Sequence, residues 1–209
     1  MKATSYFEAL QLAGQDDDWR RCLPDGCGDA VFDEISPAVW DGCRLAAQTR
    51  RWPLLLQGPT GTGKTYAVAV MLAVWRACGY QGLWMTWPEL LADIREARRT
   101  KGGVPKLNRD GRAYVRTESF YWRALGDPQR LVVLDDFGIG QADEDTLGLL
   151  HSVLTKARGP LLLTSNLTPE RMEQEQAIDH RIASRLRGGT IVEIDGADRR
   201  RGKRLRVQA

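Results

Sequence analysis

Gly58-Pro59-Thr60-Gly61-Thr62-Gly63-Lys64-Thr65 is the most informative stretch of this 209-residue chain. It matches the pattern G-x-x-x-x-G-K-[ST], and it lies between an apolar run at 54–57 and a stretch at 64–78 that we expect to be helical. In a phosphate-binding loop, glycines let successive backbone N–H groups turn toward phosphate oxygens, and the helix N-terminus adds partial positive charge. We therefore expect all eight residues to contact a nucleotide, with Lys64 at the β- and γ-phosphates and Thr65 on Mg²⁺.

A second motif supplies carboxylates for the same site. Residues 131–134 are apolar, and Asp135 and Asp136 follow them directly. A buried strand of this kind ends beside the phosphate loop, so Asp135 can hold Mg²⁺ through water and Asp136 can orient the attacking water as general base. Aspartate is one methylene shorter than the glutamate usual at the second position, which predicts slower hydrolysis. The alternative is that the two aspartates simply end a strand.

The remaining apolar runs set the fold class. We expect strands at 54–57, 82–87, 131–135, 161–165 and 190–194. Between them we expect helices at 64–78, 88–99, 113–125, 144–158 and 178–187, one starting at Pro169, and a loop at 100–111. Apolar strands without alternation, separated by helices, are typical of an α/β protein whose parallel sheet is covered on both faces.

Polar residues at element ends are further candidates. Asn166 follows the apolar run 161–165, where its side chain could reach a γ-phosphate or could simply form a turn. Arg181, Arg185 and Arg187 lie on one expected helix, and the first two share a face through their i,i+4 spacing. Such a pair suggests contact with phosphate, although a solvated face fits the spacing equally well.

Composition excludes several classes of protein. The 43% hydrophobic content argues against disorder along the whole chain, and no apolar run approaches the ~20 residues of a membrane span. Four cysteines are too few for a disulfide scaffold, and Cys22, Cys27, His151 and His180 offer no convincing zinc spacing. The N-terminus has no apolar stretch of a signal peptide. We therefore expect a cytoplasmic protein with no membrane partner.

The net charge of +3 conceals a gradient along the chain. Residues 1–50 carry 5 basic and 9 acidic side chains, whereas residues 180–209 carry 9 and 3. A basic end indicates contact with phosphate or is a solvated tail.

Residues 89–116 form a second basic stretch. They hold 8 basic and 4 acidic side chains. The basic residues are Arg95, Arg98, Arg99, Lys101, Lys106, Arg109, Arg112 and Arg116, with Tyr114 among them and Phe120, Tyr121 and Trp122 shortly after. Cations with nearby aromatics suit single-stranded DNA. The alternative is a solvated helix and loop, with the aromatics in the core.

Five segments in this order resemble a known family. They are GPTGTGKT at 58–65, LVVLDDFG at 131–138, LLLTSNL at 161–167, HRIASRL at 180–186 and GADRR at 196–200. The series is similar to the DnaC-type AAA+ ATPases, which include replicative helicase loaders and the IstB transposition helpers. The resemblance implies a P-loop NTPase fold with a five-stranded parallel sheet in the order 5-1-4-3-2. Because only nine residues follow Arg200, we expect no helical lid domain.

The resemblance also implies roles and partners. Asn166 would be the sensor-1 residue, Arg185 the arginine finger toward a neighbouring subunit, and Arg200 a sensor acting within its own subunit. ATP and Mg²⁺ would be the cofactors, and a replicative helicase, single-stranded DNA and further copies of the chain the partners. Residues 46–209 would form the ATPase domain with a basic tail, after an acidic helical segment or linker at 1–45. A transposition helper, or a nucleotide-gated scaffold with little turnover, remains an alternative.

Overall fold

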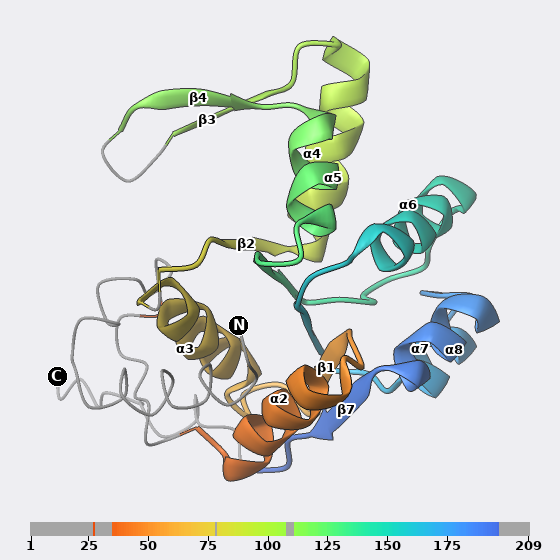
Figure 1. Cartoon of the computed structure of the whole chain (residues 1–209). Coiled ribbons are helices and arrows are strands. Elements are labelled where there is room, and N and C mark those ends of the chain that lie inside the picture. The colour runs from red at the N-terminus through yellow and green to blue at the C-terminus, as the bar shows by residue number, and fades with distance from the viewer. Residues whose placement is uncertain (1–26, 28–34, 78, 108–110, 197–209) are drawn as a thin grey trace, which may run out of the picture.

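The computed structural model describes residues 27, 35–77, 79–107 and 111–196. Its centre is a parallel sheet whose strands pair in the order β2-β5-β6-β1-β7 (Figure 1). The strands are β1 (Leu54–Gln57), β2 (Gly82–Thr86), β5 (Leu131–Asp135), β6 (Leu161–Ser165) and β7 (Thr190–Glu193). Within the described residues, no helix is long and apolar enough to span a membrane. The predicted α/β class is confirmed.

The strand order differs in its labels from the expected 5-1-4-3-2. The described residues contain seven strands rather than five, because two unpredicted strands lie between β2 and β5 in the sequence. When the five strands of the parallel sheet are numbered among themselves, their order is 5-1-4-3-2. The carboxyl ends of β1, β5 and β6 therefore lie side by side at one edge of the sheet.

Helices cover both faces of the sheet. The core on one side contains residues of α2 (Pro37–Thr49) and α3 (Lys64–Ala77). The core on the other side contains residues of α4 (Trp87–Thr100), α5 (Glu118–Gly126), α6 (Glu144–Lys156), α7 (Pro169–Gln174) and α8 (His180–Gly188). Successive residues of β5 alternate between the two cores, with Val133 in the first and Leu134 in the second. The three central strands β1, β5 and β6 are thus buried on both faces, which explains their largely apolar sequences. The edge strand β7 alternates buried and exposed residues instead.

Side-chain caps fix where the helices begin. The Asp143 carboxylate accepts a hydrogen bond of 2.8 Å from the backbone N–H of Thr146 at the start of α6. Thr168 caps α7 in the same way, and Pro169 occupies the first turn. These two predicted helix starts are confirmed. The caps satisfy N–H groups that have no partner within the helix.

The structure corrects the prediction for residues 100–125. The expected loop at 100–111 contains β3 (Val104–Leu107), and the first residues of the expected helix at 113–125 form β4 (Ala113–Arg116). The two strands pair antiparallel as a hairpin apart from the main sheet. Helix α5 begins only at Glu118. The hairpin was missed because Gly102, Gly103 and Pro105 made its first strand resemble a loop.

Candidate nucleotide-binding site

The phosphate-binding loop joins β1 to α3 at the carboxyl edge of the sheet. Gly58, Gly61 and Gly63 have φ values of 149°, 86° and 93°, a range of backbone conformation that residues other than glycine rarely adopt. A Cβ atom on Gly58 would lie 2.1 Å from the carbonyl oxygen of Ile194. The glycines at these positions are therefore required by the backbone, as the sequence motif implied.

Lys64 holds its ammonium group inside this loop. Its side chain is buried, and Nζ donates hydrogen bonds of 2.7 Å to the carbonyl oxygens of Gly58 and Pro59. The Thr62 hydroxyl donates to the Pro59 carbonyl at 2.9 Å and braces the same turn. The charge is thus centred in the loop, where a phosphate group would meet it together with the backbone N–H groups.

Thr65 and Asp135 bring two oxygen ligands together. Thr65 Oγ1, in the first turn of α3, donates a hydrogen bond of 3.3 Å to Asp135 Oδ1 at the end of β5. Burial raises the pKa of the Asp135 carboxyl, and the neighbouring Asp136 carboxylate raises it further. A hydroxyl and a carboxylate are the hard oxygen donors that Mg²⁺ prefers, and a bound cation would offset the cost of the buried charge. These residues therefore fit the predicted Mg²⁺ site.

Thr164 links both carboxyl-bearing residues and was not singled out from the sequence. Its hydroxyl donates to Asp135 Oδ1 and accepts a hydrogen bond of 3.1 Å from the Asp136 backbone N–H. Asp136 itself is exposed, with φ of 54°. A polar residue near the end of β6, the strand beside β5, was the available signal. This signal could be interpreted only with the strand order, which places the end of β6 beside Asp135.

Asn166 is placed next to the phosphate loop by the same strand. The backbone N–H of Gly58 donates a hydrogen bond of 3.2 Å to the Ser165 carbonyl oxygen, so Asn166 directly follows the contact. Its side chain is exposed. The Ser165 hydroxyl accepts a hydrogen bond from the Leu167 N–H at 3.1 Å, so the local turn also forms. Asn166 thus lies beside the phosphate loop, on a turn that the sequence also allowed, and its contact with a γ-phosphate stays a prediction.

The arginines of α8 lie apart from this group. Arg185 donates a hydrogen bond of 2.6 Å to Thr155 Oγ1 on α6, and Arg187 pairs with Glu170 at 3.2 Å. Arg181 is exposed, and neither a hydrogen bond nor an ion pair joins its side chain to the described residues. Arg181 and Arg185 thus lie on one exposed face of α8, as the sequence predicted. Arg185 contacts none of the phosphate-loop residues of its own chain. Arg200 lies outside the described residues.

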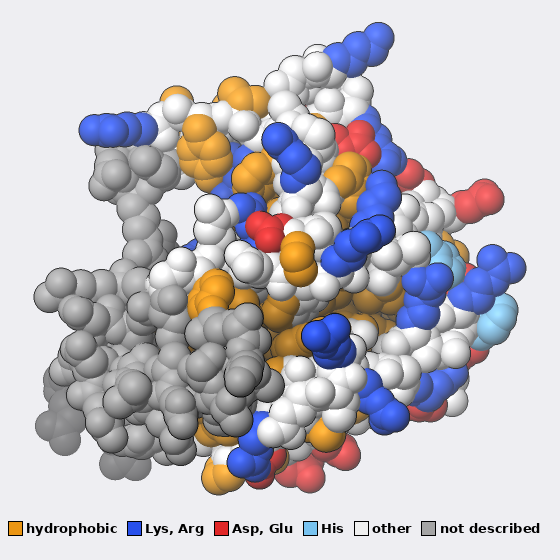
Figure 2. Space-filling view, in the orientation of Figure 1, with side chains coloured by type: hydrophobic (Ala, Val, Ile, Leu, Met, Phe, Trp, Pro, Cys, Tyr) orange, Lys and Arg blue, Asp and Glu red, His pale blue; other side chains and the backbone are white. Residues whose placement is uncertain are grey.

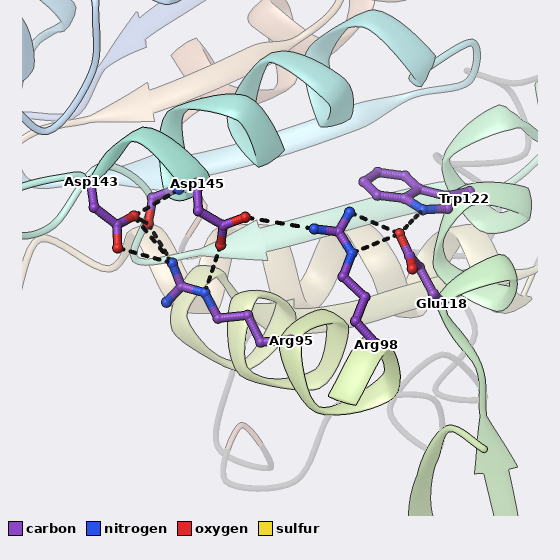
Figure 3. Close-up of polar contacts among 7 residues, drawn as sticks. Arg95, Arg98, Glu118, Trp122, Asp143 and Asp145 are labelled. Atoms are coloured by element: carbon purple, nitrogen blue, oxygen red, sulfur yellow. Dashed lines mark hydrogen bonds and ion pairs between the residues drawn. The ribbon is translucent and has the colours of Figure 1, made fainter. Parts of the chain in front are cut away.

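Four of the basic side chains expected to bind DNA have carboxylate partners instead. Arg95 contacts Asp143 and Asp145, and Arg98 contacts Glu118 and Asp145 (Figure 3). Arg99 and Lys106 are paired with Glu96 and Asp93, respectively. Arg109 lies outside the described residues. The basic stretch is therefore largely neutralised along α4.

The neighbouring aromatics also differ from the DNA expectation. Tyr121 is fully buried, and its hydroxyl donates a hydrogen bond of 2.6 Å to Asp93. Trp122 donates its indole N–H to Glu118 at 2.9 Å, while Phe120 packs against the core. Tyr114 alone of these four is exposed. The alternative of aromatics in the core is thus the better description of this region.

The cysteines and histidines form no metal site in the part of the chain that the structure describes. Cys27 is buried, Cys22 lies outside the described residues, and His151 contacts the Asp179 carboxylate at 3.0 Å. Within the described ranges, no group of three or more His, Cys, Asp or Glu side chains could hold a metal ion.

Solved structures share this arrangement at low sequence identity. DnaI has a TM-score of 0.57 and 19% identity, over 87% of this chain and 98% of DnaI. The DnaC helicase loader has a TM-score of 0.59 and 16% identity, over 82% of this chain and 100% of DnaC. The chain shares the fold of the DnaC helicase loader. The replication initiator DnaA, bound to AMPPCP and single-stranded DNA, has a TM-score of 0.61 and 17% identity over 82% of this chain.

These likenesses establish a shared fold. The chain spans only 50% of the DnaA chain that it matches. No protein-family model and no curated protein matches the sequence.

Proposed function

We propose that this chain is a Mg²⁺-dependent AAA+ ATPase that acts in DNA replication, as a loader of the replicative helicase. The observation that carries the ATPase assignment is the hydrogen bond between Thr65 and Asp135, which joins the phosphate loop to the carboxylate strand. The likeness to DnaC and DnaI supports the loader role. We expect the protein to act in the cytoplasm, where ATP and replicating DNA are present.

The residues around the loop divide the reaction among them. The backbone N–H groups of 58–65 and the Lys64 ammonium bind the β- and γ-phosphates of ATP. Thr65 and Asp135 would hold Mg²⁺, which neutralises charge on the phosphates. Asp136 orients the attacking water and accepts its proton, and Asn166 donates to that water or to the γ-phosphate.

A neighbouring copy supplies the remaining charge. Arg185 contacts Thr155 on α6 and none of the phosphate-loop residues of its own chain. In the proposal it therefore acts on the γ-phosphate bound by a neighbouring copy. The proposal therefore includes nucleotide-dependent self-association, with Arg200 as a further contact to the nucleotide within one subunit. Arg181 on the same helix is exposed and is available to assist Arg185.

Hydrolysis and Mg²⁺ binding are tested together by steady-state ATPase assays. We expect Lys64→Ala to abolish nucleotide binding, and Asp135→Asn to preserve binding while abolishing turnover. A protein that binds ATP and Mg²⁺ normally, yet shows no turnover with DNA and helicase present, would instead be a nucleotide-gated scaffold. The shortened side chain of Asp136 is the observation that favours that second function.

The proposal includes binding of single-stranded DNA. Two observations support this: the sequence resembles the DnaC-type family, and the fold is similar to that of DnaA bound to single-stranded DNA. Binding of a labelled dT oligonucleotide is measured with ATP over a salt series. We expect its affinity to fall steeply with salt, because Lys and Arg displace counterions from the phosphates. A transposition helper would instead prefer duplex DNA and a transposase over a helicase.

A further inference from the structure

The β3–β4 hairpin projects from the body of the molecule to one side of the upper part of α4 and α5 (Figure 1). Its register pairs Val104 with Arg116 and Lys106 with Tyr114, and these pairs alternate with Pro105–Val115 and Leu107–Ala113. Directly opposed residues of an antiparallel pair point to the same face. The hairpin therefore has one face built from each set of pairs.

Polar contacts attach the first face to the helices. Lys106 Nζ forms an ion pair of 2.8 Å with Asp93 of α4, and Asp93 also accepts the hydrogen bond from Tyr121 of α5. The Arg116 guanidinium lies 5.3 Å from the ring centre of Tyr114 and 5.1 Å from that of Phe120. The hairpin is thus held in place from this inner face.

The outer face is apolar and uncovered. Its four residues, Pro105, Leu107, Ala113 and Val115, are all exposed, Leu107 to 70% and Val115 to 56%. Figure 2 shows hydrophobic and basic side chains together on this projecting part of the molecule. Four apolar side chains on one face of a short sheet form a contiguous patch, and such patches commonly mark interaction sites.

An open hollow adjoins the base of this patch. It has a volume of about 400 Å³ and is lined by residues of α4, the hairpin base and α5. Gly103 lines the hollow, and a Cβ atom there would lie 2.8 Å from Val115 Cγ1. The outer face thus continues into a depression that could receive a side chain of a partner.

The charges around the patch indicate which occupant fits. Lys106 is already paired with Asp93 on the inner face, whereas Lys101 is exposed and lines the hollow. A second copy of the same hairpin would bring the Lys101 charges of the two copies together. The phosphates of a nucleic acid could pair with Lys101, but the aliphatic side chains of Leu107 and Val115 offer no ring on which a base could stack. Apolar side chains bordered by carboxylates would complement both the patch and its rim.

We propose that the outer face of the β3–β4 hairpin docks a partner protein whose contact surface has apolar side chains bordered by carboxylates. The proposal rests on the proposed function in one respect, since that function supplies the partner to test, the replicative helicase. The hairpin then acts as an adaptor that belongs to the ATPase domain itself.

The test uses the purified full-length chain and the purified replicative helicase of the same cell, with ATP and Mg²⁺. The double variant Leu107→Ser, Val115→Ser removes the apolar patch, and Leu45→Ser, which changes a 50% exposed leucine on α2, is the matched control. We expect the double variant to bind the helicase at least tenfold more weakly, and Leu45→Ser to bind normally. Lys101→Asn should weaken binding a few-fold, because asparagine tolerates the positive φ at this position but lacks the charge.

Three further readouts accompany the binding measurement. Basal ATPase activity, thermal unfolding and dT oligonucleotide affinity should be unchanged in the double variant, since neither residue touches the nucleotide site or the core. Equal helicase binding by wild type and double variant would overturn the docking proposal and leave the proposed function standing. A loss of oligonucleotide binding or of self-association, with helicase binding retained, would also overturn it. If the wild-type chain does not bind the helicase, both the loader function and this proposal fail.

Discussion

The hydroxyl group of Thr164 donates a hydrogen bond to Asp135 Oδ1 and thereby joins the carboxyl ends of β6 and β5. The hydroxyl oxygen of Thr164 also accepts a hydrogen bond of 3.1 Å from the backbone N–H of Asp136. One threonine thus orients the carboxylate proposed to hold Mg²⁺ and fixes the backbone of the proposed general base. Residues that orient metal ligands commonly affect metal affinity as much as some ligands do.

Replacing Thr164 with valine tests this link. Valine keeps the shape but removes both hydrogen bonds, and the loss of the donor should raise the pKa of Asp135 further. We expect the Mg²⁺ concentration for half-maximal ATPase activity to rise several-fold and the turnover number to fall roughly tenfold or more. Thr164→Ser, which retains the hydroxyl, should stay near the wild type. An unchanged Mg²⁺ requirement in Thr164→Val would show that the threonine only packs the strand.

Mixing two inactive variants tests whether the active site is shared between copies. Lys64→Ala removes the phosphate contact, and Arg185→Ala removes the proposed finger. Combined, they should partly restore ATPase activity, because an intact loop from one copy can face an intact finger from the other. The matched control replaces the Lys64→Ala protein with a chain that carries both substitutions, and this mixture should remain inactive. No recovery at any mixing ratio would place Arg185 outside the neighbour's site.

Removing Arg95 separates a structural role from DNA binding. Its guanidinium contacts Asp143 and Asp145, but the side chain is 44% exposed, so solvent screens the ion pairs. We expect Arg95→Ala to lower the free energy of unfolding by about 0.5–1 kcal/mol, measured by urea denaturation, with a smaller effect at high salt. Oligonucleotide affinity should not change. Arg123→Ala removes an exposed charge that only contacts a backbone carbonyl, and it serves as the control. A large loss of oligonucleotide affinity in Arg95→Ala, but not in Arg123→Ala, would instead show that α4 contacts DNA.

The elements predicted well were those whose signals are local. The strand at 131–135 and the loop from Gly58 to Thr65 follow from consecutive residues, and the cap at Asp143 depends on the next three positions. The hairpin was missed because β3 and β4 stabilise each other only as a pair of segments that are separate in the sequence. Tyr114 and Val115 favour a strand, but no apolar alternation in 104–107 indicated a partner for them.

Only part of the candidate site could be predicted from the sequence. Lys64, Thr65 and Asp135 follow from motifs that encode their own geometry. Thr164 and the ion pairs of Arg95 depend on residues roughly 30 and 50 positions away. Such contacts are set by the order of the strands and the packing of the helices, so the charge of a segment alone could not reveal that its arginines were already paired.

Two glycines with opposite surroundings provide a final test of the loop geometry. Gly58 has a φ of 149°, and a Cβ atom there would meet the Ile194 carbonyl oxygen. Gly148 lies within α6 with open space around it. We expect Gly58→Ala to lower the free energy of unfolding by about 2 kcal/mol or more and to abolish ATP binding, since either the loop or the Ile194 backbone must move. Gly148→Ala should raise it by about 0.5–1 kcal/mol with activity unchanged, because alanine restricts the unfolded chain and favours the helix. Equal stabilities of the two variants in urea denaturation would contradict the described contact between the loop and Ile194.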